Sequence, residues 1–156
     1  MNQPNIEGVV IRPLILNTDG RGWLIELFRT DELQPPISPL MSYVSMTKPG
    51  LLRGPHEHRE QTDYFCFIGP STFLVRLWDN RKDSRTFGAK IEIELGEHNK
   101  ASVIVPPGVV HGYKNIGTVD GLMYNAPNRL YGGEGKDGPI DEIRYENIDG
   151  HKFSME

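Results

Sequence analysis

The sequence predicts a single all-β domain, built as a sandwich or barrel of many short strands. Three observations lead to this fold class. Apolar residues recur mostly with a period of two, as on a half-buried strand. Turn-forming dipeptides such as Asp19-Gly20, Pro49-Gly50 and Pro107-Gly108 separate the apolar segments, and the 156 residues include 17 Gly and 12 Pro. No window of 11 or more residues carries an apolar stripe of helical period.

Each expected strand is a short apolar or alternating segment between two turns. The clearest lies at 89–95, where Ala89 and Leu95 bound an alternation of apolar residues with lysine and glutamate. The other expected strands cover residues 9–11, 23–28, 42–47, 64–68, 73–77, 101–105 and 122–125. From Gly132 onward the chain is polar and rich in glycine, so residues 132–156 are expected to form a surface extension of the one domain, 1–156, with residues 143–145 as the candidate ordered segment in it.

Composition excludes several classes of protein. Lys and Arg number 17 and Asp and Glu 21, a formal charge of −4, so the basic excess of a general nucleic-acid binder is missing. A single cysteine, Cys66, excludes an internal disulfide framework. No apolar run approaches the roughly 20 residues that span a bilayer, and the start MNQPNIEGVV does not have the pattern of a signal peptide. We therefore expect a cytoplasmic protein without membrane or nucleic-acid partners.

Histidines mark the candidate site. His56 and His58 are two residues apart, so in an extended segment both point to the same side. His111 follows Pro106-Pro107-Gly108, a turn that would place it at the start of a strand. The spacing resembles the two-part signature of the cupin barrel, whose segments face each other in the barrel. Two chemistries remain open: a metal site of His56, His58, Asp63 and His111, or metal-free acid–base catalysis.

Five further motifs resemble the dTDP-4-dehydrorhamnose 3,5-epimerase family, in the family's order over roughly residues 7–131. They are Asp19-Gly20-Arg21-Gly22-Trp23-Leu24-Ile25-Glu26, Leu52-Arg53-Gly54-Pro55-His56, Thr86-Phe87-Gly88, the run from Gly96 to Tyr113, and Leu122-Met123-Tyr124. The resemblance implies a cupin-type double-stranded β-helix, or jelly-roll, barrel. It also implies a homodimer whose N-terminal strands cross to the partner.

The resemblance further implies epimerisation of a nucleotide-linked, dTDP-type 4-keto-6-deoxy sugar at C3, C5 or both. This reaction belongs to deoxysugar, rhamnose or surface polysaccharide biosynthesis. His56 would be the base and Tyr124 the acid on the opposite face of the sugar ring. No metal or organic cofactor would be needed, because the substrate's ketone accepts the electrons. The substrate-binding residues would be Arg21, Trp23, Glu26, Arg53, His58 and His111.

The chain departs from the family pattern in two places that bear on catalysis. Gln61-Thr62-Asp63 stands where the family has a lysine, and the aspartate that orients the catalytic histidine has no clear counterpart. Asp63, Asp141 and Asp149 are candidates for that role. Two alternatives to the epimerase therefore stay open: a metal-dependent cupin isomerase or oxygenase, and a non-catalytic protein that binds sugar nucleotides.

Overall fold

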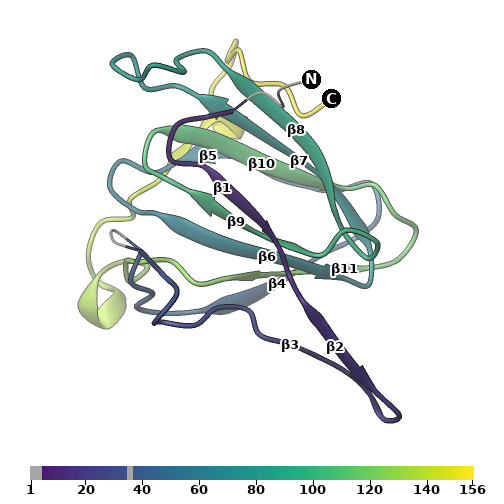
Figure 1. Ribbon diagram of the computed structural model, residues 1–156. Helices are drawn as coiled ribbons and strands as arrows, with labels where there is room; N and C mark the ends of the chain where they lie inside the picture. The colour runs from purple at the N-terminus through teal and green to yellow at the C-terminus, as the bar shows by residue number, and fades with distance from the viewer. Residues whose placement is uncertain (1–4, 35–36) are drawn as a thin grey trace.

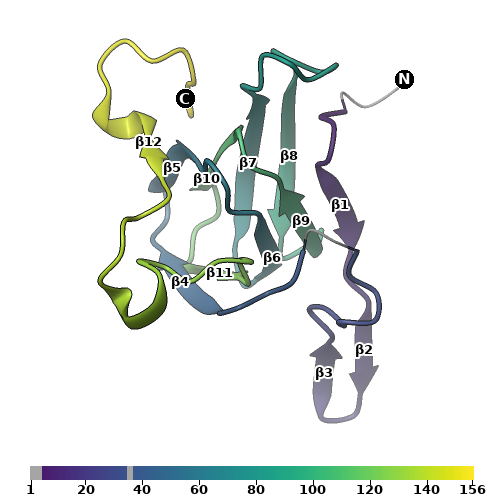
Figure 2. The same ribbon diagram turned by 90° about the vertical axis from the view of Figure 1, so that its left-hand side faces the viewer.

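Two five-stranded antiparallel sheets face each other in the computed structural model of the protein, which describes residues 5–34 and 37–156 (Figures 1 and 2). The first sheet has the order β1-β9-β6-β11-β4 and the second the order β12-β5-β10-β7-β8. The strands are β1 (Val10–Pro13), β2 (Leu16–Asp19), β3 (Gly22–Ile25), β4 (Tyr43–Thr47), β5 (Leu52–Glu57), β6 (Asp63–Gly69), β7 (Thr72–Asp79), β8 (Lys90–Gly96), β9 (Ala101–Val105), β10 (Val109–Asn115), β11 (Gly121–Asn125) and β12 (Ile143–Arg144). This arrangement confirms the predicted jelly-roll barrel.

The main core lies between the two sheets, where alternate side chains of each strand meet. Phe65, Phe67 and Met123 of the first sheet pack against the second sheet's residues, among them Phe73 and Leu77. All five are nearly or fully buried. Burial of each such side chain stabilises the fold by roughly 1.5–3 kcal/mol.

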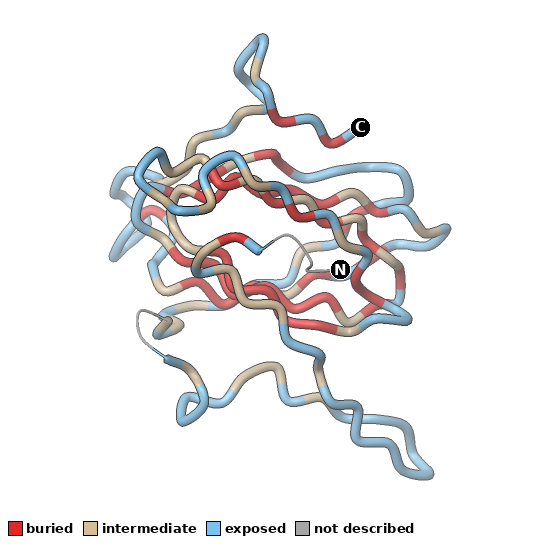
Figure 3. Tube along the Cα trace, turned by 45° about the horizontal axis from the view of Figure 1, so that its top comes forward, coloured by how far each residue is buried: buried red, intermediate tan, exposed pale blue. Residues whose placement is uncertain are grey.

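A second apolar layer covers the outer face of the first sheet. Tyr64, Cys66 and Ile104 alternate in sequence with residues that face the main core, and they pack against Leu27 and Phe28 of the segment that follows β3. The central strands β6 and β9 are therefore buried on both faces, while β4 at the edge of the sheet is mostly exposed. Figure 3 draws buried residues as red tube, which lies mainly in the middle of the molecule. Cys66 is a buried core thiol, and burial raises its pKa to about 12.

The hairpin of β2 and β3 projects away from the two sheets (Figures 1 and 2). Its two-residue turn is formed by Gly20 and Arg21, between the paired residues Asp19 and Gly22, and its strands pair only with each other. Apolar side chains on it remain in solvent: Ile15 is 76% exposed and Trp23 is 55% exposed. A hairpin with so much exposed apolar surface suits contact with another protein surface.

The C-terminal segment runs across the second sheet. After the 3-10 helix η1 (Glu134–Lys136), β12 pairs with β5, and η2 (Tyr145–Asn147) follows. Phe153 then packs on Trp78, on the sheet's outer face. No helix among the described residues is long and apolar enough to cross a membrane.

Every expected strand overlaps an observed one, and the H-x-H segment is extended as predicted. The expectation missed β2, because Leu-Asn-Thr-Asp has no apolar alternation and is held only by its hairpin partner.

Candidate active site

Three histidines meet inside the barrel beside the edge formed by β4 and β5. His56 of β5 stands directly opposite His111 of β10, and their ring centroids are 4.4 Å apart. His58 follows β5, with its ring 5.6 Å from His56 and 5.8 Å from His111. The side chains of His56 and His58 are 17% and 10% exposed, and that of His111 is 3% exposed. The structure therefore brings the three predicted histidines into one cluster.

In two of the three imidazole rings, a backbone carbonyl determines which nitrogen carries a proton. His58 Nδ1 donates to the carbonyl of Asp141, and His111 Nδ1 donates to the carbonyl of Val109 at 2.9 Å. A carbonyl oxygen only accepts, so each Nδ1 must be protonated. The Nε2 atoms of both rings then point at one carboxylate oxygen, Asp63 Oδ2, at 3.1 Å and 3.3 Å.

Asp63 is the buried anion beneath the histidines. Burial alone would raise its pKa, but the hydrogen bonds and charges of His111 and His58 hold the pKa well below its usual range. Burial also disfavours the charged form of His58, yet the hydrogen bond and charge of Asp63 outweigh this and raise the pKa of His58 to about 9. His58 is therefore an imidazolium at neutral pH, paired with Asp63.

His56 has the opposite electrostatic environment. Burial, followed by the nearby His111 and His58 rings, lowers the pKa of His56 to about 2. This imidazole is therefore neutral at working pH, but a pKa so far below neutral also makes it a weak proton acceptor. The cluster thus holds a neutral and a cationic imidazole side by side.

A carboxylate that sequence reasoning missed lies beside His56. Glu142 Oε1 is 3.7 Å from His56 Nε2, and Glu142 also accepts from Arg144 at 2.7 Å. Two of the three acidic residues expected near His56 have other partners. Asp63 faces His58 and His111, while the Asp141 carboxylate accepts from the backbone N–H groups of residues 59, 60 and 61. No contact between Asp149 and His56 is seen.

A polar chain leads from Asp63 to the opposite sheet. Asn125 on β11 donates one amide hydrogen to Asp63 Oδ1 at 2.8 Å and the other to the hydroxyl of Tyr43 at 3.1 Å. The carbonyl of the same amide accepts from the N–H of Tyr64 at 3.0 Å. Asn125 is fully buried with every polar atom bonded, so the amide is fixed in this orientation.

Tyr124 lies on the other face of β11 from the histidines, and its role as the acid stays a prediction. Tyr124 pairs with Cys66 across β6 and with Val44 across β4, and it packs in the outer layer with Cys66. Its neighbours Met123 and Asn125 point into the barrel. Successive side chains of a strand alternate between faces, so Tyr124 lies on the far side of the sheet from the histidines.

Arg53 lies at the same open edge as the histidines. Its guanidinium donates to the hydroxyl of Thr47 at 3.0 Å and to the carbonyl of Met46 at 2.8 Å. These two hydrogen bonds connect β5 to β4. The side chain reaches solvent, so the remaining guanidinium donors are available to an anionic ligand.

Arg21, Trp23 and Glu26 do not meet the histidines within this chain. All three lie on or just after the projecting hairpin (Figure 2). Arg21 is bound only by Asp19, at 2.6 Å, and Glu26 lies 3.6 Å from Arg29. A nucleotide-binding role for them stays a prediction, and it requires a second copy of the chain.

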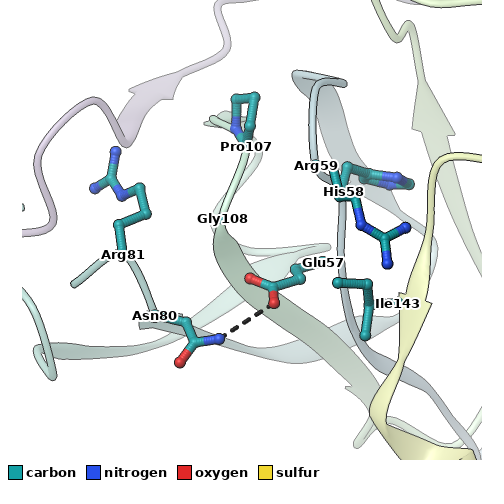
Figure 4. Close-up of a pocket in the computed structure, with 8 residues that line it drawn as sticks. All are labelled: Glu57, His58, Arg59, Asn80, Arg81, Pro107, Gly108 and Ile143. Carbon is teal, nitrogen blue, oxygen red and sulfur yellow. Dashed lines mark hydrogen bonds between the residues drawn. The ribbon is translucent and has the colours of Figure 1, made fainter. Parts of the chain in front are cut away.

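A shallow cleft of about 360 Å³ opens on the other side of β5 (Figure 4). Glu57 points into it and accepts from Asn80 at 3.2 Å, and Tyr145 donates to the same carboxylate. In Figure 4 the Glu57 carboxylate and the His58 ring leave the strand in opposite directions. Glu57 therefore anchors the C-terminal segment and does not belong to the histidine cluster.

The cluster has the donor set of a transition-metal site. One nitrogen from each of His56, His58 and His111 lies within 4.8 Å of the others. Asp63 Oδ2 and His111 Nε2 are buried without a hydrogen bond of normal geometry. The Nδ1–H groups of His58 and His111 rest on carbonyls, as in many metal-ligating histidines. These residues fit a divalent ion such as Zn²⁺ or Fe²⁺, which would act as a Lewis acid.

The sequence matches the family model of dTDP-4-dehydrorhamnose 3,5-epimerase over residues 3–138. The chain belongs to this family. Its members are isomerases, and so the chain is an enzyme of that class.

Relatives and solved structures agree with the family. The probable low-salt glycan biosynthesis epimerase Agl13 of Haloferax volcanii is 43% identical over 136 residues, 86% of each chain. The spore coat polysaccharide biosynthesis protein SpsL of Bacillus subtilis is 35% identical over 72% of this chain and 73% of its own. The crystal structure of a dTDP sugar isomerase from Desulfovibrio desulfuricans has the same fold, with a TM-score of 0.80 and 23% identity over 96% of this chain and 91% of that one.

Proposed function

We propose that the protein epimerises a nucleotide-linked 4-keto-6-deoxy sugar, of the dTDP type, at C3, C5 or both. The supporting observation is the cluster of His56, His58 and His111 inside the barrel, with the Glu142 carboxylate 3.7 Å from His56. Relatives named for glycan and spore coat polysaccharide biosynthesis suggest that the product enters a surface polysaccharide. We place the reaction in the cytoplasm, where sugar nucleotides are made.

The chemistry follows from the substrate's ketone at C4. This carbonyl acidifies the hydrogens on the neighbouring carbons, so a base of ordinary strength removes one as a proton. His56 accepts that proton, and Glu142 stabilises the imidazolium that forms. The charge that develops on the ketone oxygen is stabilised by the His58 imidazolium, which takes the role of the family's lysine although Gln61-Thr62-Asp63 occupies that lysine's position. Arg53 binds the diphosphate.

Deuterium exchange tests this proposal. With dTDP-4-keto-6-deoxyglucose in D₂O, the wild-type protein should incorporate deuterium at C3 or C5 and yield an inverted sugar. His56→Asn should abolish both. His98→Asn, a change at an exposed loop residue, is the matched control and should leave both rates unchanged. If the wild-type protein exchanges no deuterium with every sugar nucleotide tested, the proposal is contradicted. That result would favour a non-catalytic binding protein.

We also propose that the active form is a homodimer. Support comes from two exposed apolar surfaces: the hairpin with Leu16, Trp23 and Leu24, and the outer face of the β4–β11 edge with Val44 and Met46. In a dimer the hairpin of one chain would cover the other chain and bring Arg21, Trp23 and Glu26 to its site. Sedimentation should show a dimer, and Trp23→Glu should give a monomer with little epimerase activity; a monomeric, fully active wild type would contradict this.

A second candidate function follows from the unbonded Asp63 Oδ2 and His111 Nε2, which favour a metal-dependent isomerase or oxygenase. In this case Co²⁺ added to protein that a chelator has freed of metal should produce a visible absorption band. The band should saturate at one Co²⁺ per protein chain. His58→Ala should lose the band and His98→Ala should keep it. If Co²⁺ gives no band, the metal-dependent function is wrong and the epimerase proposal is unaffected.

A further inference from the structure

A β-bulge brings Arg53 to the same face of β5 as His56. His56 pairs with His111 of β10 and Arg53 pairs with Tyr113, so three steps along β5 lie opposite two steps along β10. Residues two apart on β10 share a face, and Tyr113 belongs to the core between the sheets. Residues directly opposite in an antiparallel pair also share a face. Arg53 and His56 are therefore on the barrel side together, although residues three apart on a regular strand face opposite ways.

We infer that Thr47 positions the Arg53 guanidinium for the diphosphate of the substrate, an inference that rests on the proposed epimerase function. Nε of Arg53 donates to the Thr47 hydroxyl at 3.0 Å, and Nη2 donates to the Met46 carbonyl at 2.8 Å. Nε and Nη2 lie on one edge of the planar group, so both bonds attach that edge to β4. Among residues 5–34 and 37–156, no oxygen accepts from Nη1. Nη1 and the second hydrogen of Nη2 thus form a free fork, which suits two oxygens of one anion.

Thr47 is itself held rigidly. It is 4% exposed, it pairs with Gly121 of β11, and its carbonyl accepts from the side-chain amide of Asn115 at 2.8 Å. Asn115 is fully buried, and its amide oxygen accepts from Ser71 at 2.7 Å and from the N–H of Gly117 at 3.0 Å. The hydroxyl that orients Arg53 therefore stands on a fixed support. An arginine ordered in advance loses less conformational entropy when its ligand binds.

The partners of Arg53 orient its charge without neutralising it. Both are neutral oxygen atoms, one in a hydroxyl and one in a backbone carbonyl. A carboxylate partner would instead compete with the phosphate for the same guanidinium. Such pairing is found at three other arginines: Arg21 with Asp19, Arg76 with Glu92 and Arg144 with Glu142. A diphosphate that reaches Arg53 meets a cation to which no described residue contributes a carboxylate.

Titration calorimetry with dTDP tests the inference. Thr47→Val keeps the shape of the side chain but removes the hydroxyl, so dTDP should bind about 10-fold more weakly, the scale of one hydrogen bond to a charged group. Thr47→Ser restores the hydroxyl and should bind dTDP as the wild type does. Thr118→Val, at an exposed loop threonine, is the matched control and should not change the affinity.

A double-mutant cycle separates positioning from a general structural effect. Arg53→Ala should weaken dTDP binding, and adding Thr47→Val should weaken it no further, because Thr47 acts only through the guanidinium. An additional loss of about 10-fold in the double variant, the size expected for Thr47→Val alone, would overturn the inference. With dTDP-4-keto-6-deoxyglucose, Thr47→Val should raise KM with kcat nearly unchanged, since the diphosphate keeps the same contacts in the ground state and the transition state.

The outcomes distinguish this inference from the proposed function. If Thr47→Val binds dTDP as tightly as the wild type, the positioning role is wrong and the epimerase proposal stands. If thermal melting shows that Thr47→Val is not folded, Thr47→Ala takes its place and should show the same loss of affinity. A wild-type protein that binds no nucleoside diphosphate and exchanges no deuterium would instead contradict the epimerase function, and the role of Thr47 with it.

Discussion

At the scale of single residues, the protonation of the histidines depends on backbone carbonyl oxygens, which accept hydrogen bonds but cannot donate them. The carbonyls of Asp141 and Val109 hold the Nδ1 protons of His58 and His111, which turns both Nε2 atoms toward Asp63. Two acceptor nitrogens and one anionic oxygen cannot meet without a cation between them. The proton on His58 supplies that cation, so His58 and His56, two chemically identical side chains, differ in charge.

Glu142 is the residue whose role at this scale is easiest to test. Glu142→Gln keeps the shape of the side chain but removes the negative charge that stabilises the His56 imidazolium, so kcat should fall by roughly 10- to 100-fold, with KM nearly unchanged. Steady-state kinetics measures this, with the exposed Glu94→Gln as the control. A variant with wild-type kcat would show that Glu142 only binds Arg144.

The sequence predicted the histidines but not all of their partners. Spacing and the family motifs suffice to place His56, His58 and His111 together. They do not reveal Glu142, because it lies in a polar segment with no apolar pattern to indicate its path. The direction of the Tyr124 side chain could not be predicted, because Leu-Met-Tyr has no alternation that says which of its side chains enters the barrel.

At the scale of elements, β5 controls the geometry of the cluster through Gly54. This residue has φ +85°, a conformation that side chains disfavour, and it lies tightly against β10. A Cβ there would stand 2.7 Å from the carbonyl oxygen of His111 and 3.1 Å from Nδ1 of His56. Only glycine lets β5 approach β10 closely enough to bring the two imidazoles together.

Gly54→Ala should therefore damage both stability and the site. The left-handed backbone costs roughly 1–2 kcal/mol with a side chain, and overpacking adds about 1–3 kcal/mol. The free energy of unfolding should fall by at least about 2 kcal/mol and deuterium exchange should be lost. Gly20→Ala, where a Cβ meets nothing within 4 Å, is the control. Equal unfolding curves for the two variants would contradict this account.

Strands were the most predictable elements, since a two-residue apolar period depends only on local sequence. Residues 143–145 stood out as an ordered segment in a polar tail, but the partner strand of β12 could not be predicted, because two residues carry no information on what they pair with. That pairing places Glu142 beside His56, so a long-range contact completes the site.

At the scale of the whole molecule, the shifted histidines make stability depend on pH in both directions. Between pH 6.5 and about 9 the folded protein keeps a proton on His58 that the unfolded chain releases, so stability falls as pH rises. Below pH 6.5 the unfolded chain protonates His56 while the folded protein does not, so stability falls as pH drops.

Melting temperatures measured from pH 4 to 10 with a chelator present should therefore be highest near pH 6.5. His58→Gln should flatten the alkaline side and leave the decline on the acid side. His151→Gln, at a histidine outside the cluster, should reproduce the wild-type curve. A melting temperature that rises steadily from pH 6.5 to 9 would show that His58 is not the cation of the site.

The C-terminal segment that runs across the second sheet has a consequence for limited proteolysis. Its strand β12 pairs with β5 and brings Glu142 to His56, whereas the three imidazoles belong to residues 56–111. A cut that releases this segment would therefore take Glu142 away from His56 and leave all three histidines on the rest of the chain.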